Sequence, residues 1–386
     1  MAKQPKILRL CSYPTDRRPG MGLAVYELAD MPGFNTTIYT YRPGTGEKLR
    51  PLKSASARLV PLKFASPEMP RKRSGPAFLL KQVQRLGAIV GFNSRVIIRS
   101  LGTSYDIVHI HSPMHALTGL IGKMRGAITC LTIHGTDFSR IAESSLIRAS
   151  LKPIDVIFCM THAHQRQLRE WFPAKHVVYV ANGTDIEYFS KDPPDSADRR
   201  KQIVGVGTLR WHKNFAALLR SFAALAKKDC EWRLTILGEG SDRQSLTRLA
   251  DEMGIADRVS LPGAVSREHV RDALQQSAIF VLPSVTEGIP KALLEAMAAG
   301  CACIATDVGD CREVLGASGL IVPPADDDRL TGALLALADS QAARHRLSKA
   351  AVRRSRNYTW SAYAQKHAEA YREVLEERRT IAKARS

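Results

Sequence analysis

Short apolar runs alternate with longer stretches of helical periodicity along most of the chain. Continuous apolar runs bounded by polar segments are typical of buried strands in parallel sheets, and the stretches between them suit the helices of βαβ units. The predicted strands cover residues 7–11, 36–41, 107–111, 128–133, 156–160 and 177–180, then 203–206, 233–237, 259–261, 279–282, 301–305 and 319–322. The pattern predicts two consecutive α/β units, each with a doubly wound parallel sheet.

A stretch rich in Pro, Asp and Lys interrupts this alternation at residues 189–201. Turn-forming and charged residues of this kind indicate a linker. The chain length of 386 residues also favours two domains over one. We expect an N-terminal domain over residues 1–188 and a C-terminal domain over 189–357. From Tyr358 onward the pattern predicts a long helix that ends in a basic region.

The composition is that of a soluble globular protein, with 45% hydrophobic residues. No apolar run is long enough to cross a membrane, and the first residues lack the features of a signal peptide. Seven scattered cysteines without a metal-ligand or disulfide pattern fit a reducing compartment. We therefore expect a cytoplasmic protein.

The formal net charge of +19 is unevenly spread. Residues 63–100 hold eight Lys or Arg and a single acid, Glu68, with large apolar residues interleaved. This mixture is typical of amphipathic helices on an anionic membrane, where each basic residue contributes about 1 kcal/mol. An ordinary basic helix with its apolar side in the domain core has the same composition. Phosphates of nucleic acid also attract basic charge, but no nucleic-acid recognition motif is present, and we expect no nucleic-acid partner.

Two carboxylates, Glu287 and Glu295, stand eight positions apart across a predicted loop-to-helix junction. A buried strand leads into the loop, Pro290 suits the first helical position and Gly300 suits the stop. Glu287 then projects from the carboxyl end of a strand, where open α/β sheets bind ligands. The free N–H groups of the following helix suit an anionic diphosphate.

A second motif, Gly207-Thr-Leu-Arg-Trp-His-Lys-Asn214, follows the first strand of the C-terminal half and opens a helix. Arg210 and Lys213 are three positions apart, so both can point at one bound group. Cations at a helix start oppose the helix dipole, and this local conflict favours a functional role. Fixed cations there can stabilise the negative charge that grows on a departing diphosphate. The alternative is a basic helix start without a ligand.

Candidate residues in the N-terminal half also lie at predicted strand ends. Gly22 follows the first strand in a Gly-Met-Gly loop, and glycine permits close backbone approach to a phosphate or sugar. Arg17 precedes this loop. His134 ends one strand, in the sequence His-Gly-Thr-Asp, and His111 ends another. His109, His111 and His115 lie close together in the sequence. Because His109 and His111 are alternating residues of one predicted strand, we expect no metal site.

These motifs, in their order along the chain, resemble those of the retaining GT-B glycosyltransferases of glycosyltransferase family 4. The resemblance implies an α/β fold of GT-B type, with two doubly wound Rossmann-like domains facing a central cleft. It implies an acceptor-binding N-terminal domain and a nucleotide-sugar-binding C-terminal domain. It also implies that the C-terminal helix, residues 358–386, packs back on the N-terminal domain. One departure is that Met21 separates two glycines that are adjacent in the family.

The resemblance also implies individual roles. Glu287 would contact the donor sugar near the reacting carbon, Glu295 the ribose hydroxyls, and His134 the donor sugar. The implied catalytic residues are His134, Arg210, Lys213 and Glu287. The implied donor-binding residues are Gly22, Arg210, Lys213, Gly238, Glu287, Gly288, Ile289, Pro290 and Glu295. His111 and Arg17 are expected on the acceptor side.

The expected function is retaining transfer of a sugar from a nucleotide-diphosphate donor to an acceptor hydroxyl. Arg210 and Lys213 can take the place of a divalent cation, so neither metal nor cofactor is expected. The basic, apolar segment suggests a lipid-linked or polysaccharide-precursor acceptor at the cytoplasmic membrane face, in cell-envelope biosynthesis. Two alternatives are a sugar-nucleotide epimerase of the same fold and a non-catalytic basic membrane-binding protein on this scaffold.

Overall fold

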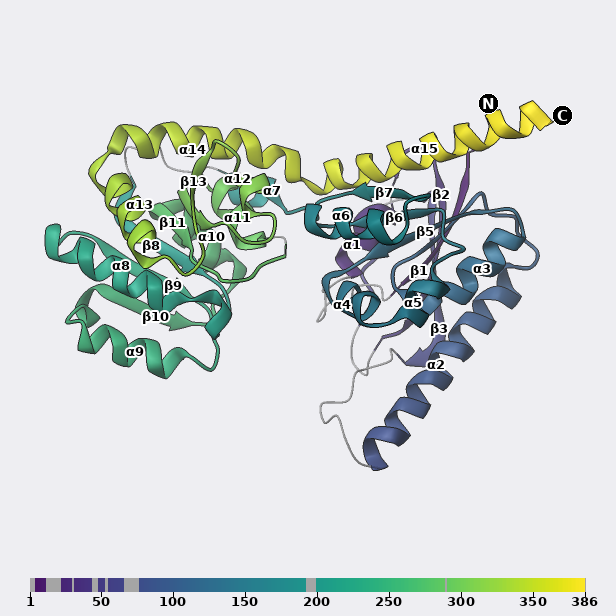
Figure 1. Cartoon of the computed structure of the whole chain (residues 1–386), viewed down its shortest axis with the longest axis horizontal. Coiled ribbons are helices and arrows are strands. Elements are labelled where there is room, and N and C mark those ends of the chain that lie inside the picture. The colour runs from purple at the N-terminus through teal and green to yellow at the C-terminus, as the bar shows by residue number, and fades with distance from the viewer. Residues whose placement is uncertain are drawn as a thin grey trace. The chain divides into compact units, whose positions relative to one another are not determined.

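The computed structural model describes residues 4–11, 22–29, 31–43, 48–52, 55–65, 76–191, 199–288 and 290–385. The chain divides into two compact units, Met1–Ala181 with Ser361–Ser386, and Asn182–Trp360. Each unit is a parallel sheet with helices packed on it (Figure 1). The turn at residues 182–185 therefore belongs to the second unit, where the Thr184 backbone N–H donates to the Tyr358 carbonyl at 2.8 Å.

The sheet of the first unit has the strand order β3-β2-β1-β4-β5-β6-β7. Its strands are β1 (Lys6–Cys11), β2 (Asn35–Arg42), β3 (Ala57–Ala65), β4 (Ile107–Ile110), β5 (Ile128–Ile133), β6 (Val156–Cys159) and β7 (His176–Tyr179). The helices are α1 (Gly22–Ala29), α2 (Pro76–Ser100), α3 (Ala116–Met124), α4 (Gly135–Glu143), α5 (Ser145–Ser150), α6 (His162–Trp171) and α15 (Trp360–Arg385), with a 3₁₀ turn η1 (Pro113–His115). The strand order reverses between β1 and β4, as in doubly wound folds.

The sheet of the second unit has the order β10-β9-β8-β11-β12-β13 and reverses between β8 and β11. Its strands are β8 (Arg200–Val206), β9 (Arg233–Leu237), β10 (Val259–Gly263), β11 (Ser277–Leu282), β12 (Ala302–Thr306) and β13 (Gly319–Val322). The helices are α7 (Ile186–Ser190), α8 (Phe215–Lys228), α9 (Arg243–Glu252), α10 (Arg267–Gln276), α11 (Lys291–Ala298), α12 (Cys311–Leu315), α13 (Asp327–Asp339) and α14 (Gln341–Ser355). Three 3₁₀ turns complete it: η2 (Trp211–Lys213), η3 (Ala256–Arg258) and η4 (Arg356–Tyr358).

The predicted fold class of two Rossmann-like α/β units is confirmed. The sequence analysis missed β3, because Pro61 and two basic residues interrupt its apolar run. β3 is an edge strand, where a proline that cannot donate to the ladder is tolerated. The expected linker at 189–201 is shorter in the structure, since α7 extends to Ser190 and β8 begins at Arg200. Residues 192–198 lie outside the described part.

Helix α15 contributes side chains to the core of the first unit. Arg9, on β1, is fully buried, and its Nη1 donates to Tyr371 Oη on α15 at 3.1 Å and lies 2.9 Å from His109 Nδ1. His109 Nε2 lies 2.8 Å from Thr132 Oγ1 on β5. Burial lowers the pKa of His109 well below 6.5, which keeps its ring neutral. Its ring nitrogens are thus used in core hydrogen bonds.

Candidate active site

The loop that carries Glu287 joins β11 to α11 at the carboxyl end of the second sheet. It is held by Thr306, whose Oγ1 donates to the Ser284 carbonyl at 2.5 Å. Gly309 packs closely beneath the loop with φ +54°, and a Cβ there would collide with the Glu287 and Gly288 carbonyl oxygens. Helix α11 then starts at Lys291, with Pro290 as its N-cap. The expected Glu287-to-helix junction is therefore present, with the helix starting one residue later than predicted.

The structure brings two of the predicted site residues, Lys213 and Glu287, into contact. Lys213 Nζ donates to Glu287 Oε1 at 2.5 Å, and Ser284 Oγ donates to the same oxygen at 2.7 Å. Both charged side chains are largely buried, at 17% and 10% exposed. The two loops leave β8 and β11, the neighbouring strands at which the order of this sheet reverses. Ligands of open α/β sheets bind at this switch point.

The backbone conformation of the loop after β8 explains why asparagine follows Lys213. Lys213 ends the turn η2, and Asn214 adopts φ +50° before α8 begins. Asparagine is among the few residues other than glycine that adopt this left-handed conformation readily. The Val285 N–H donates to the His212 carbonyl at 2.9 Å, which links this loop to that of Glu287. Arg210, by contrast, is exposed and forms no salt bridge among the described residues.

A third loop, after β9, packs against the loop after β8 through glycines. A Cβ on Gly238 would collide with the Gly207 carbonyl oxygen, and one on Gly240 would collide with that of Leu209. The Leu209 N–H donates to the Glu239 carbonyl at 2.9 Å. Gly238 thus allows two loops to approach at the carboxyl edge of the sheet.

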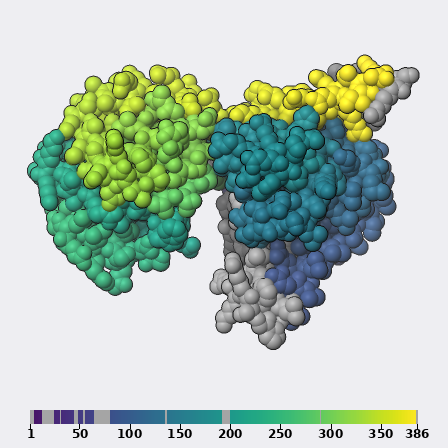
Figure 2. Space-filling view, viewed as in Figure 1, coloured from purple at the N-terminus to yellow at the C-terminus, as the bar shows by residue number. Residues whose placement is uncertain are grey.

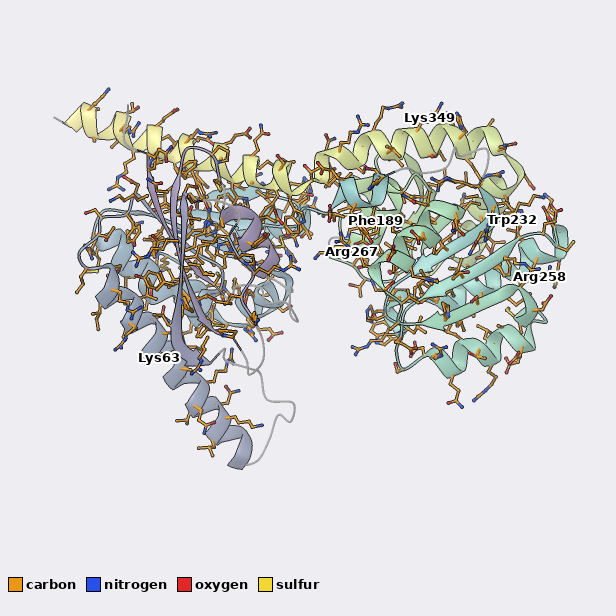
Figure 3. The ribbon with its side chains drawn as sticks, turned by 180° about the vertical axis from the view of Figure 1, so that it is seen from behind. Lys63, Phe189, Trp232, Arg258, Arg267 and Lys349 are labelled. Atoms are coloured by element: carbon orange, nitrogen blue, oxygen red, sulfur yellow. The ribbon has the colours of Figure 1, made fainter. Side chains whose placement is uncertain are left out.

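Glu295 lies on α11, and burial raises its pKa to about 7, although the charges of Arg267 and Lys291 act in the opposite direction. Near neutral pH its carboxyl group is therefore divided between protonated and ionised forms. Arg267 and Phe189 lie near each other in Figure 3, and the Arg267 guanidinium carbon is 5.4 Å from the ring centroid of Phe189. The same carbon is 4.3 Å from the ring centroid of Tyr188. Glu295 can accept hydrogen bonds from a vicinal diol once it is ionised.

In the first unit, His111 and His134 lie at the carboxyl ends of the neighbouring strands β4 and β5. Both are 5% exposed. His134 is the N-cap of α4, and its carbonyl accepts from the Asp137 N–H at 2.9 Å. His111 stacks on His109 with the ring centroids 4.2 Å apart, and neither of its ring nitrogens has a hydrogen-bond partner among the described residues.

Asp137 and Arg140 complete this edge, and the sequence analysis did not name them as site residues. Asp137 is 4% exposed, and burial raises the pKa of its carboxyl group. Arg140 Nη1 lies 3.8 Å from Asp137 Oδ1, and Asp137 Oδ2 has no hydrogen-bond partner within the described segments. The sequence signal that could have identified them is that an acid and a base stand three positions apart on the helix that begins after His134.

Three predicted site residues have little or no described structure. Arg17 and Ile289 lie outside the described residues. Gly22 is the first residue of α1, which follows β1 along the chain. Their expected roles remain predictions.

Models of two protein families match the chain. Glycosyltransferase Family 4 matches residues 25–188, and Glycosyl transferases group 1 matches residues 189–354.

Two curated relatives illustrate the similarity. The phosphatidylinositol N-acetylglucosaminyltransferase gpi3 subunit of Schizosaccharomyces pombe is 27% identical, over 57% of this chain and 50% of the relative, so the match spans about half of that protein's length. A D-inositol 3-phosphate glycosyltransferase of Thermobispora bispora is 28% identical, over 70% of this chain and 71% of the relative.

Solved structures show the same fold at low identity. Sucrose-phosphate synthase from Thermosynechococcus elongatus has a TM-score of 0.71 and 19% identity, covering 97% of this chain and 100% of that one. Anabaena HepE in complex with UDP has a TM-score of 0.69 and 15% identity, covering 96% and 100%.

Proposed function

Because the chain belongs to the group 1 glycosyltransferases of glycosyltransferase family 4, which have the GT-B fold, we propose that it transfers a sugar from a nucleotide-diphosphate donor to an acceptor hydroxyl. The observation that carries the proposal is the contact of Lys213 with Glu287 at the switch point of the second sheet. A cation and a carboxylate meet there, at the edge where the diphosphate and the sugar of a donor would lie.

Donor binding would separate the roles of this pair. Lys213 would donate to the diphosphate, and Glu287 would accept from sugar hydroxyls. Arg210, which has no salt-bridge partner among the described residues, would add a bidentate contact to the phosphate. Glu295 would accept hydrogen bonds from the ribose, and a UDP-bound structural neighbour is consistent with a nucleotide in this fold.

The proposed chemistry is transfer with retention at the anomeric carbon and without a metal ion. As the glycosidic C–O bond breaks, negative charge grows on the departing phosphate, and the two fixed cations stabilise it. The phosphate oxygen then accepts the proton of the acceptor hydroxyl, which attacks from the same face. Lys213 and Arg210 supply the positive charge that a divalent cation would otherwise supply.

We place the acceptor on the first unit, at the edge formed by His111, His134 and Asp137. Among the described residues, the ring nitrogens of His111 and Oδ2 of Asp137 have no hydrogen-bond partner, which suits an acceptor with several hydroxyls. The names of two relatives include phosphatidylinositol and inositol 3-phosphate. We propose a lipid-linked or polysaccharide-precursor acceptor of this polyol kind.

Helix α2 supports a peripheral contact with an anionic membrane at the cytoplasmic face. Phe92 and Val96 are fully buried against the sheet. The outer side of the helix nevertheless exposes further large apolar side chains: Leu80, Val83, Leu86, Val90 and Ile98. The helix contains no acid, and its blue segment lies at the surface in Figure 2. A helix that only covers a core needs one apolar face, so the outer apolar side chains favour a partner. No described helix has the length and apolarity to span a bilayer.

The proposal is tested by binding and turnover measured together. A thermal-shift screen against UDP, GDP, ADP, TDP and CMP without metal should single out one nucleotide, since a ligand at 100 times its dissociation constant stabilises by about 2.7 kcal/mol. The corresponding nucleotide sugar should then be consumed only when an acceptor is present. Consumption without an acceptor would indicate an epimerase, and binding without consumption a non-catalytic protein.

A further inference from the structure

A polar cavity lies in the first unit at the amino ends of its strands, which is the edge of the sheet opposite to His111 and His134. Its volume is about 670 Å³. Lys6, Asn35 and Arg58 stand at or next to the first residues of β1, β2 and β3. The wall is formed by Arg99, near the end of α2, and by Tyr105.

The strand register places the polar side chains of this cavity on one face. Lys6 pairs with Asn35, Thr37 with Arg58, and Tyr39 with Val60. Because side chains alternate along a strand and paired residues share a face, Lys6, Thr37, Tyr39 and Arg58 project from the same side. Tyr39 belongs to the apolar cluster that contains Phe92 and Val96 of α2. The side chains therefore face α2.

The charged side chains that line this cavity are all basic. Lys6, Arg58 and Arg99 line it, and no lining residue is acidic. Neither arginine forms a salt bridge within the described part of the chain. The charges of both arginines act on Tyr39 and oppose the rise in its pKa that burial causes. Asp106, which does not line the cavity, accepts from the Lys6 backbone N–H at 2.7 Å.

We propose that this cavity binds a phosphate group, at a site separate from the candidate active site. Two guanidinium groups and an ammonium group supply charge, and the hydroxyls of Thr37, Tyr39 and Tyr105 supply further donors. Guanidinium groups bind phosphate bidentately, and a phosphate monoester has enough oxygens to use several donors at once. The expected ligand is a phosphate monoester, either on a lipid headgroup or on a soluble molecule.

The surroundings of Arg99 favour the lipid source. Ile98 is 62% exposed and Leu101 57% exposed, so apolar side chains flank Arg99 at the end of the outer apolar face of α2. If α2 lies on a bilayer, the cavity mouth beside Arg99 is close to headgroup phosphates. The hypothesis that the phosphate belongs to a lipid headgroup rests on the membrane contact proposed above, whereas binding of a soluble phosphate does not.

The test compares Arg58→Gln and Arg99→Gln with Arg95→Gln as the matched control. Arg95 is also exposed on α2 and loses the same charge, but it does not line the cavity. Calorimetric titration of the full chain with inorganic phosphate should show saturable binding. Loss of a charged hydrogen-bonding partner should weaken it about tenfold or more in Arg58→Gln and Arg99→Gln, and Arg95→Gln should bind as the wild type does.

Vesicle flotation identifies the source of the phosphate. Phosphatidylcholine vesicles with phosphatidic acid, which carries a monoester, are compared with vesicles containing phosphatidylglycerol at equal surface potential. A preference for phosphatidic acid that is lost in Arg99→Gln but kept in Arg95→Gln supports the lipid headgroup. Saturable phosphate binding without that preference supports a soluble ligand. Absence of saturable phosphate binding, or equal losses in all three variants, overturns the proposal. Nucleotide binding should persist in every variant, so a failure here leaves the proposed transferase function standing.

Discussion

The carboxyl edges of the two sheets differ in how far their polar groups are already satisfied. In the second unit, Glu287 accepts hydrogen bonds from both Lys213 and Ser284. In the first, His111 and Asp137 are more deeply buried than Glu287, yet both ring nitrogens of His111 and one carboxylate oxygen of Asp137 have no partner among the described residues. Buried polar groups without partners are costly. The polar groups at the carboxyl edge of the second sheet are thus paired within the protein, whereas the described residues leave polar groups of the first edge without partners, as suits the proposed acceptor site.

Replacing Lys213 by Ala should break the organised edge most severely. Removal of one group that stabilises developing charge lowers turnover by roughly 10²–10³-fold. Steady-state kinetics with the donor identified in the nucleotide screen measure the effect. Lys227→Ala is the control, since Lys227 is an exposed lysine near the end of α8, the helix that follows the same loop. Unchanged turnover in Lys213→Ala would remove this lysine from the site.

Glu295→Gln should stabilise the ligand-free protein at alkaline pH. The pKa of Glu295 is raised from 4.5 to about 7 in the folded state, so the folded state holds the proton more tightly than the unfolded chain. The tighter proton binding by Glu295 in the folded state adds to the free energy of unfolding. This stabilisation is fully present below about pH 4.5 and is lost as the pH rises through about 7. At 1.36 kcal/mol per pKa unit, the complete loss is roughly 3.4 kcal/mol.

Urea denaturation of the wild type and Glu295→Gln at pH 5 and pH 8 measures this difference. The variant should gain relative to the wild type at pH 8 and bind nucleotide more weakly. A variant that is less stable than the wild type at pH 8 would show that the Glu295 carboxylate is not costly in the folded protein.

The raised pKa of Glu295 should also make the affinity for the nucleotide rise with pH. In the proposed donor complex, ribose hydroxyls donate to the ionised carboxylate, so that bound nucleotide would lower the pKa of Glu295 and release its proton. The association constant should increase by up to about tenfold per pH unit below the free-state pKa and level off above about 7. Calorimetry from pH 5.5 to pH 8 with the nucleotide sugar tests it, because both phosphates of the sugar nucleotide stay ionised throughout this range, and Glu295→Gln should lack this rise.

Much of this fold could be predicted from the sequence, but the contacts within the site could not. The periodicity located twelve of the strands, because buried parallel strands are continuous apolar runs. The contact of Lys213 with Glu287 spans 74 positions and depends on which strands are neighbours, which no local pattern records. Composition alone also left open which apolar residues of α2 face the core. Packing of Phe92 and Val96 decides this and leaves Val83 and Val90 outside.

The same substitution at His109, on β4, and at His111, which directly follows this strand, compares a ring with hydrogen-bond partners to one that has none among the described residues. His109→Phe should destabilise by about 1–3 kcal/mol, because it removes a partner of the buried Arg9 and of Thr132. His111→Phe should leave stability unchanged or slightly higher, since its ring nitrogens lose no bonds to described residues. It should instead raise the KM for the acceptor while nucleotide affinity stays the same. Equal destabilisation by both changes, measured by urea denaturation, would show that His111 is a satisfied core residue.

The smallest expected effect concerns the outer face of α2. Val83 and Val90 are 62% and 52% exposed, so their replacement by Ser should leave the fold unchanged. Each loses at most about 1–1.5 kcal/mol of apolar contact with a bilayer, which corresponds to a loss of vesicle affinity of several-fold. Gln84→Ser on the same helix is the control, because Gln84 is exposed and already polar. Flotation with phosphatidylglycerol vesicles measures the difference, and high salt should weaken the basic contribution while the difference between Val and Ser persists. If the Val83→Ser and Gln84→Ser proteins float equally, the outer apolar face does not enter a membrane, and α2 presents it to some other partner.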